Sequence, residues 1–307
     1  MTALPISVTG NRSVRRHGHD ISGLVFAGAL LLALLLSLAV LMVLVGTQVA
    51  QGAPVFAERG IDFLTSDLSS NPADAGVAQG LIGTALLVAI VALAAFPVGI
   101  ATAIYLEEYS ADNRLARFID INIRNLAGVP SVVYGILGLT VFVALFASIG
   151  DGNGKTVITG GLTLAVLVLP IVIITSAEAI RAVPNALREA GFGLGASRWQ
   201  VIRKLILPAA APGILTGTVL ALARAIGETA PLILVGAVLG SFSTAGTVGD
   251  LVTGPYTALP AIIFDWARKP QEEFRALTSA AIVVLLVVTI VANAFAILLR
   301  NRYDRKW

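Results

Sequence analysis

The sequence predicts an all-α membrane protein with six transmembrane helices and with both termini in the cytoplasm. Hydrophobic residues make up 57% of its 307 positions and charged residues only 13%, which is far from the balance of a soluble protein. Apolar runs of about twenty residues recur along the chain, and each is long enough to cross a hydrocarbon core of about 30 Å. In lipid the backbone polar groups need partners within their own segment, so each run is expected to be a helix.

Hydropathy places six spans along the chain. The first run follows three N-terminal arginines, but it is much longer than the ~7–15 apolar residues of a signal peptide, so we expect a permanent first span. The spans are, in order, Ile21–Val49, Val77–Leu106, Pro130–Ile149, Val157–Ile180, Pro212–Leu239 and Leu277–Leu299. They divide the chain into a cytoplasmic tail (1–20), a first helix (21–49), an external loop (50–76), a transmembrane domain (77–300) and a second cytoplasmic tail (301–307).

The distribution of basic residues gives the orientation of these spans. With the N-terminus inside, 15 of the 21 Lys and Arg residues fall in cytoplasmic segments, 5 fall in outer loops and Arg224 lies within a span. Cytoplasmic loops of membrane proteins carry an excess of Lys and Arg, so this orientation is favoured over its reverse. It follows that the loop between the fourth and fifth spans faces the cytoplasm.

Proline and glycine interrupt several of the spans. Both residues are common in membrane helices, so each one alone is ordinary, but together they are compatible with helices that bend. The residues are Pro97, Gly99, Pro170, Gly227 and Pro231. The long outer loop Gly240–Ala276 is expected to include a short interfacial helix near Trp266.

The cytoplasmic loop after the fourth span contains a regular spacing of small residues. Glu189-Ala190-Gly191 is followed after three residues by Gly195, and after nine more by Leu205-Ile206-Leu207-Pro208. This pattern resembles the EAA loop of ABC-transporter permeases (E-A-A, three residues, G, nine residues, I-x-L-P), with Gly191 and Leu205 as the two departures. The resemblance implies two short cytoplasmic helices, joined by a glycine turn, that dock on an ATP-hydrolysing subunit. The alternative is a plain helical hairpin whose basic residues only obey the charge rule.

The residue types in this EAA-like loop (189–208) fit such a docking surface. Gly195 is expected to supply a turn with a φ that a β-carbon would penalise. Pro208 is expected to end the second short helix, because it lacks an N–H and clashes with the preceding turn. Arg198 and Trp199 form an amphipathic knob that suits a groove on a partner. The residues predicted to dock on the ATPase are Glu189, Ala190, Gly195, Arg198, Trp199, Leu207 and Pro208.

Two charged residues lie inside the expected fifth span. Arg224 and Glu228 are four residues apart, so they are expected to share one face of that helix. A charge at membrane depth costs at least ~2.5–3.5 kcal/mol, and such residues usually face a bundle interior or a wet cavity. Arg224 can offer planar paired donors to an oxyanion, with Glu228 orienting it and tempering its grip. We predict a substrate path along Arg224, Glu228 and the next residue, Thr229; the alternatives are a self-neutralising pair and a contact with another subunit.

Longer stretches resemble one group of these permeases. Asn125–Gly135, which opens the third span, is similar to the LAGxPSVVxG stretch of phosphate-specific permeases. Further stretches that fit the same family are Arg181–Pro184, Leu187–Ala190, Ala221–Pro231 and Lys269–Phe274. The resemblance covers residues 77–300 approximately, and it implies the type I ABC permease (MetI-like) fold. By this resemblance Arg224 matches the family's fifth-helix arginine, which is associated with phosphate passage.

The same resemblance implies the partners of the chain. They are a second permease subunit (PstC-like) in a heterodimer, a cytoplasmic ATPase dimer (PstB-like) and an external phosphate-binding protein (PstS-like). ATP and Mg are then bound by the partner ATPase, since no cytosolic segment of this chain has a Walker A loop. We expect no cofactor in this chain, contact with membrane lipid and no contact with nucleic acid.

Other functions lack the residues that they need. The chain has no cysteines, and His17 and His19 in the N-terminal tail indicate solvated residues rather than a metal site. Apart from Arg224 and Glu228 the spans hold no cluster of residues that would support catalysis, so we expect a transport subunit and not an enzyme. A secondary transporter would need inverted repeats, which are not evident. The remaining alternative is a type I ABC permease for another oxyanion, such as sulfate or molybdate, in the bacterial inner membrane.

Overall fold

The computed structural model describes residues 21–110, 114–149, 152–238 and 248–303, and within these ranges every regular element is helical. Six helical segments are long and apolar enough to cross a membrane. They are Ser22–Arg59, Ala78–Tyr109, Ser131–Ile149, Val157–Arg181, Arg198–Gly227 and Glu273–Arg302. The predicted all-α fold with six membrane helices is therefore confirmed.

The chain divides into two compact units, residues 1–47 and residues 48–307. The described part of the first unit, residues 21–47, is the N-terminal portion of helix α1 (Ile21–Arg59). Nearly all of its leucine, valine and phenylalanine side chains are exposed. Such a surface needs apolar surroundings, which the hydrocarbon of a bilayer provides.

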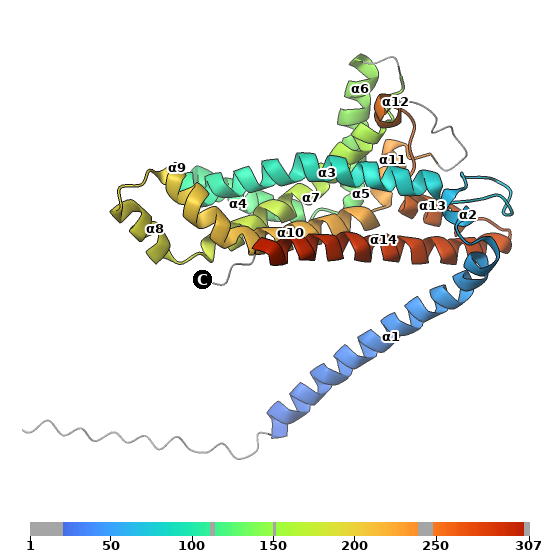
Figure 1. The fold of residues 1–307 in the computed structure, drawn as a ribbon, viewed down its shortest axis with the longest axis horizontal. Helices are drawn as coiled ribbons and strands as arrows, with labels where there is room; N and C mark the ends of the chain where they lie inside the picture. The colour runs from blue at the N-terminus through green and yellow to red at the C-terminus, as the bar shows by residue number, and fades with distance from the viewer. Residues whose placement is uncertain (1–20, 111–113, 150–151, 239–247, 304–307) are drawn as a thin grey trace, which may run out of the picture. The chain divides into compact units, whose positions relative to one another are not determined.

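Four long helices form the body of the second unit. Figure 1 shows them running side by side: α3 (Ala78–Ile104), α7 (Val157–Arg181), α10 (Leu207–Gly227) and α14 (Glu273–Tyr303). Helix α7 packs against both α3 and α10, and α10 packs against α14. Small residues permit this close approach, because a Cβ at Gly99 of α3 would lie 2.7 Å from Val172 Cγ1 of α7. Helix α7 is consequently the central helix of this unit.

Shorter elements lie at both ends of these helices. One end carries α8 (Asn185–Gly193) and α9 (Arg198–Val201), and the other end carries α2 (Asp62–Thr65) and α13 (Leu259–Trp266) (Figure 1). The remaining α-helices are α4 (Arg114–Ala127), α5 (Ser131–Leu137), α6 (Ala144–Ile149), α11 (Ala230–Val235) and α12 (Val248–Thr253). Three π-helical turns continue longer helices, η1 (Tyr105–Tyr109), η2 (Gly138–Val143) and η3 (Ile202–Ile206).

The segment predicted as an external loop is largely folded. Helix α1 runs ten residues beyond the predicted end at Val49, as far as Arg59, and α2 follows it. Phe63 of α2 is fully buried, with its ring centroid 6.4 Å from that of Trp266. The helix expected near Trp266 exists as α13, but Trp266 itself is buried instead of lying at an interface. These aromatic side chains therefore close the outer end of the second unit with a core of their own.

The fifth span differs most from the prediction, because two helices replace the single helix expected from Pro212 to Leu239. Helix α10 begins earlier, at Leu207, and ends at Gly227. Glu228 then adopts an extended conformation (φ −81°, ψ 122°), and α11 begins at Ala230 with Pro231 in its first turn. Proline fixes its own φ and lacks an N–H, so it suits the start of a new helix better than the continuation of an old one. Leu239 lies outside the described residues.

Candidate functional site

The EAA-like loop forms the two short helices and the glycine turn that its sequence predicts. Helix α8 ends at Gly193, and Gly195 has a φ of +77°. No atom lies within 4 Å of where a Cβ of Gly195 would be, so backbone conformation alone favours glycine there. Ser197 then starts α9 with a capping box, in which its Oγ accepts from the N–H of Gln200 and its own N–H donates to Gln200 Oε1.

Gly191, the departure from the second alanine of the motif, lies where α8 meets α9. A Cβ at this position would be 2.8 Å from Val201 Cγ2 and 3.0 Å from Leu205 Cδ1. The glycine therefore lets the two short helices pack more closely than an alanine would. Val201 and the following Ile202 are buried beneath this contact.

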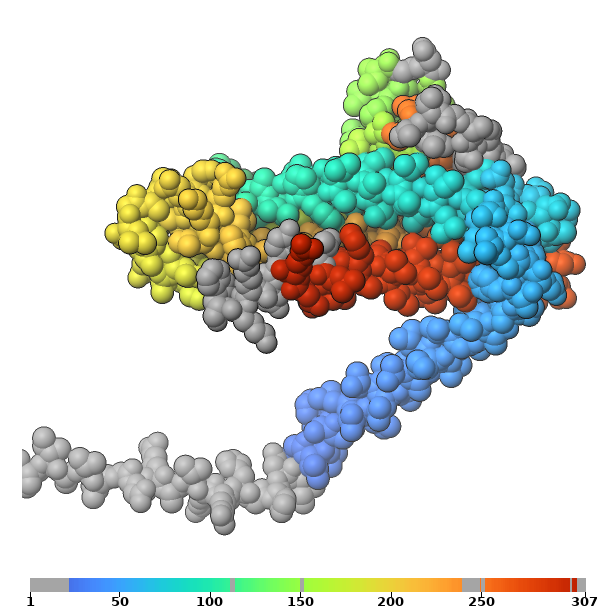
Figure 2. All heavy atoms as spheres, viewed as in Figure 1, coloured from blue at the N-terminus to red at the C-terminus, as the bar shows by residue number. Residues whose placement is uncertain are grey.

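The outer surface of the loop exposes apolar side chains beside charged ones. Leu194 is 89% exposed, Trp199 is 54% exposed and Phe192 is exposed as well. Glu189 and Arg198 are also exposed. The yellow atoms in Figure 2 show this segment forming one end of the second unit. An exposed apolar patch with a charged rim is typical of a surface that binds another protein.

Pro208 does not end the second short helix, so that prediction is wrong. Helix α9 continues through η3 directly into α10, with Pro208 in the first turn of α10. The N–H of Leu207 bonds to the carbonyl of Ile202, five residues back, which marks a π-helical turn. A proline is tolerated where the helical bonding pattern changes in this way, because its missing N–H leaves no regular bond unmade. The predicted docking residues Leu207 and Pro208 therefore belong to the base of a long helix.

Arg188 of α8 was not among the predicted site residues, yet it makes the most contacts in this region. Its Nε and Nη2 donate to Glu108 Oε1 at 3.1 and 2.8 Å. Its Nη1 donates to the carbonyl of Val183 and to Asn185 Oδ1, and its Nη2 also donates to the carbonyl of Ile180. These five hydrogen bonds use all five N–H groups of the guanidinium. Arg188 thereby joins α8 to the end of α7 and to the end of α3.

Two further arginines of this region contact the same turn at the end of α3. Arg181 forms a two-bond ion pair with Glu107, with its Nε 3.1 Å from Glu107 Oε2 and its Nη2 on Glu107 Oε1. The Arg198 guanidinium lies 5.5 Å from the centroid of the Tyr109 ring. We name Glu107, Glu108 and Tyr109 the α3 clasp. The sequence signal for it was the pair of adjacent acidic residues at the cytoplasmic end of the second span.

The predicted ion pair between Arg224 and Glu228 is present, although its geometry differs from the prediction. Arg224 Nε lies 3.3 Å from Glu228 Oε1, with Arg224 in the last turn of α10. Glu228 lies beyond the end of that helix, so the two residues do not share one helical face. The Arg224 side chain is 39% exposed, and Glu228 is less exposed. Thr229, half-buried, follows as the residue before α11. Among the described residues, Glu228 is the one that hydrogen-bonds to the Arg224 guanidinium.

Two of the stretches with the phosphate-permease resemblance pack against each other beside this pair. Helix α5, which follows Pro130, contacts α11, which follows Thr229. A Cβ at Gly135 would be 2.7 Å from the Cα of Pro231, so this glycine permits the contact. The hydroxyl of Tyr134 donates to the carbonyl of Leu126 at 2.8 Å and fixes the entry into α5. The tertiary structure thus brings together residues nearly one hundred positions apart in the sequence.

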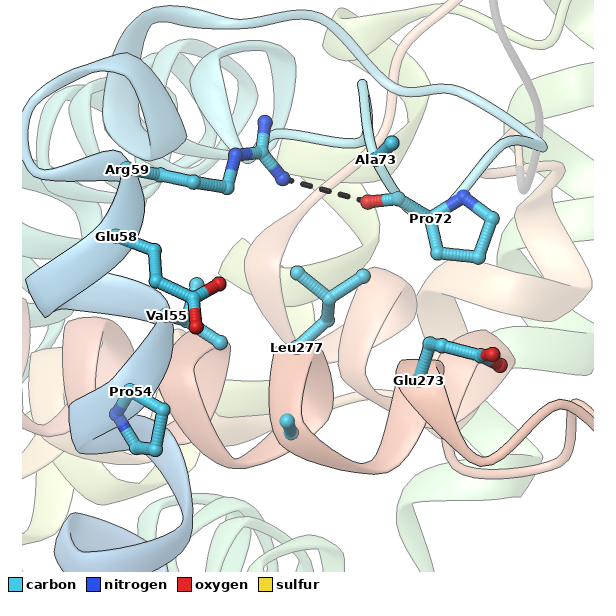
Figure 3. A pocket seen from close by; sticks show the side chains of 9 residues that line it. Pro54, Val55, Glu58, Arg59, Pro72, Ala73, Glu273 and Leu277 are labelled. Atoms are coloured by element: carbon cyan, nitrogen blue, oxygen red, sulfur yellow. Dashed lines mark hydrogen bonds between the residues drawn. The ribbon is translucent and has the colours of Figure 1, made fainter.

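A separate pocket of about 380 Å³ lies at the outer end of the second unit. Figure 3 shows the carboxylates of Glu58 and Glu273 beside it, and Arg59, whose Nη1 donates to the carbonyls of Pro72 and Ala75. Its walls include Val55 and Leu277. None of the predicted site residues lines this pocket.

Among the described residues, no group of three or more His, Asp or Glu side chains is placed to hold a metal ion. His17 and His19 lie outside the described residues, as does the predicted N-terminal tail. The predicted site residues therefore form two regions, the cytoplasmic loop and the Arg224 pair.

Residues 95–305 match the family described as "Binding-protein-dependent transport system inner membrane component". The chain is 35% identical over 248 residues to the phosphate transport system permease protein PstA of Yersinia pestis, covering 78% of this chain and 79% of the relative. It is 34% identical over 266 residues to PstA of Xylella fastidiosa strain Temecula1, covering 83% and 85%, respectively. Against PstA 1 of Mycobacterium tuberculosis strain H37Rv it is 33% identical over 224 residues, covering 73% and 69%.

Solved structures share the fold at low sequence identity. The MetNI methionine ABC transporter in an inward-facing conformation contains a chain with a TM-score of 0.58 and 16% identity, covering 75% of this chain and 98% of that chain. A bacterial ABC transporter involved in the import of the acidic polysaccharide alginate contains one with a TM-score of 0.60 and 17% identity, covering 93% and 99%. The predicted type I ABC permease (MetI-like) fold is therefore confirmed.

Proposed function

This chain belongs to the family of binding-protein-dependent transport system inner membrane components, and from this we infer that it is a permease subunit of an ATP-driven importer of inorganic phosphate. The observation that carries the inference is the similarity to three phosphate transport permeases over about three quarters of the chain. Each of those relatives is a transport component, so this chain is a multi-pass subunit of the bacterial inner membrane and not an enzyme. Sulfate and molybdate are less favoured, because no relative described above carries either substrate in its name.

Arg224 is the residue that we assign to the passing anion. An isolated charge at membrane depth is costly unless it meets a partner or water, and Arg224 has one ion-pair partner and a 39% exposed side chain. Its Nε is engaged by Glu228, which leaves the planar Nη groups to bind two phosphate oxygens. Glu228 keeps the net local charge near zero, so that an anion binds weakly enough to leave.

The exposed face of the EAA-like loop is the surface that we assign to the ATPase. Phe192, Leu194 and Trp199 supply apolar contact area, and Glu189 and Arg198 supply charged contacts at its rim. ATP and Mg belong to that ATPase dimer (PstB-like), and this chain contributes no nucleotide-binding loop. A second permease (PstC-like) forms the other half of the path, and an external phosphate-binding protein (PstS-like) delivers the anion.

Uptake of radiolabelled phosphate tests the proposal. Cells that lack their own high-affinity phosphate permease would express this chain with its partner subunits, and uptake would be measured with unlabelled phosphate, sulfate or molybdate as competitor. We expect only unlabelled phosphate to reduce the signal by more than about ten-fold at a hundred-fold excess. Equal competition by sulfate or molybdate would instead identify a broader oxyanion importer. The purified chain alone is expected to show no ATPase activity above background.

A further inference from the structure

Three consecutive residues of η1, the turn that continues α3, contact three successive arginines, the first at the end of α7 and the other two in the segment that follows α7. The contacts are within hydrogen-bonding or ring-contact distance, and they join positions between 74 and 89 residues apart. The pairs are Glu107 with Arg181, Glu108 with Arg188, and Tyr109 with Arg198. The order of the arginines along the chain is the same as the order of their partners.

The helical geometry of the α3 clasp explains why one short turn reaches all three arginines. These three residues belong to the π-helical turn η1, and consecutive side chains of a helical turn point in different directions around its axis. Arg181, Arg188 and Arg198 therefore each contact a different side chain of this turn. The turn then stops at Ser110, whose N–H bonds back to the carbonyl of Tyr105 at 2.8 Å. The segment is thus attached to η1 through three side chains instead of one.

The central pair of the clasp is the best shielded. The side chain of Glu108 is 9% exposed and that of Arg188 is 18% exposed, whereas Arg181 is largely exposed. Exposed ion pairs contribute little because water and salt compete with them, but a shielded carboxylate that loses its partner is strongly disfavoured. We expect the Glu108–Arg188 contact to persist while the loop moves.

An apolar core lies under the clasp and joins the same elements. Ala103 of α3 is buried with Ile180 of α7 and with Val201 and Ile202 at the start of the long fifth helix. Packed interiors shift as bodies because their side chains interdigitate. The end of α3 and the loop therefore form one connected piece, and α3 continues from it along α7.

We propose that Glu107, Glu108 and Tyr109 are positioning residues that carry movement of the ATPase-docking loop into α3. This rests on the proposed function, because it presumes that the ATPase moves the loop. Force then enters the membrane helices at two places, through η3 into α10 and through the clasp into α3. Glu108 is the central residue of the second connection.

Reconstituted complexes test the proposal, with this chain, the second permease and the ATPase in lipid vesicles. Two quantities are measured: ATP hydrolysis with and without phosphate-loaded external binding protein, and phosphate transported per ATP. We expect the Glu108→Gln complex to retain the ATPase subunit and its basal rate of ATP hydrolysis. The binding protein should no longer stimulate that hydrolysis, and the phosphate transported per ATP should fall about ten-fold. Glu108→Asp keeps the carboxylate and should recover part of both. Glu272→Gln, which breaks an exposed pair with Arg275 at the outer end, is the matched control and should equal the wild type.

The possible outcomes distinguish a failure of the proposed transport function from a failure of the clasp proposal. A wild-type complex that transports no phosphate would contradict the proposed function. If the wild-type complex transports phosphate, and Glu108→Gln gives the same stimulation and the same phosphate per ATP as Glu272→Gln, the clasp proposal alone is overturned. Loss of the ATPase subunit from the Glu108→Gln complex would overturn it too, because the clasp would then only support docking.

Discussion

Arg188 and Arg224 are the same residue type in two regions, and the structure uses them in opposite ways. Arg188 donates all five of its N–H groups to protein acceptors and is mostly buried. Arg224 has a single described hydrogen bond, at 3.3 Å, and more than a third of its side chain is exposed. A guanidinium with every donor satisfied holds elements in place, whereas one with free donors can bind an incoming anion. We therefore expect Arg188 to hold the cytoplasmic elements in place, and we propose that Arg224 binds the passing anion.

The largest effect is expected at Arg224, the arginine with a single described hydrogen bond. Arg224→Gln keeps most of the volume but removes the charge and the planar fork, so phosphate uptake should fall by about 100-fold or more. The complex should still assemble, which a pull-down of the ATPase subunit checks alongside radiolabelled uptake. Normal uptake would make Arg224 structural, and loss of assembly would assign the pair to a subunit interface.

A lysine at the same position sharpens this result. Arg224→Lys retains a positive charge on a flexible stem, but it cannot make the planar two-bond contact with a phosphate. Uptake should be intermediate between the wild type and Arg224→Gln. Full activity in the lysine variant would show that charge alone, and not the fork, is what the anion needs.

Replacing Arg188 should first lower the stability of the chain, and transport should be affected only after that. Arg188→Lys has three donors in place of five, so carbonyls of Ile180 and Val183 or the Glu108 carboxylate lose a partner. We expect a loss of about 2 kcal/mol, seen as a lower Tm of the purified chain. The matched control is Arg124→Lys, in an exposed pair with Asp120, which should change stability by less than about 0.5 kcal/mol. Equal Tm values for the two variants would contradict the assigned role.

A smaller effect is expected at the turn of the docking loop. Gly195→Val places a β-branched residue at a φ of +77°, which costs about 1–2 kcal/mol and should reduce capture of the ATPase subunit by about 5–30-fold. Gly193→Ala is the matched control, because it adds a Cβ in open space two residues away without a positive φ. Membrane insertion should be normal in both. Equal capture by the two variants would remove the argument that the turn shapes the docking surface.

The smallest effect is expected from a rim charge of the same surface. Glu189→Lys reverses one exposed charge, which should weaken ATPase capture by a few-fold and uncouple part of its hydrolysis from uptake. The defect should shrink as ionic strength rises, because screening acts on exposed charges. A defect that is independent of salt would indicate a packing role for Glu189.

The spans and the local structure of the EAA-like loop were predictable because their signals are local. Hydropathy located six membrane helices, although α1 runs ten residues past its predicted end and the helix of the fifth span ends at Gly227 instead of Leu239. The short helices around Gly195 were implied by the resemblance of this stretch to the EAA loop, whose pattern spans only nearby residues. The continuation of α9 through Pro208 was missed, because a π-helical turn compensates for the missing donor in a way that the sequence does not display.

The sequence by itself determined the class of protein, the number of membrane helices and the position of the cytoplasmic loop, since apolar length and the placement of Lys and Arg act segment by segment. Tertiary structure decided that Arg188 has every N–H group hydrogen-bonded and that Arg224 has a single described hydrogen bond. Arg188 finds its carboxylate eighty residues away on η1, and the break after Gly227 removes Glu228 from the helix that carries Arg224. Both outcomes depend on how distant helices pack, because a guanidinium is saturated only by the acceptors that packing brings within reach.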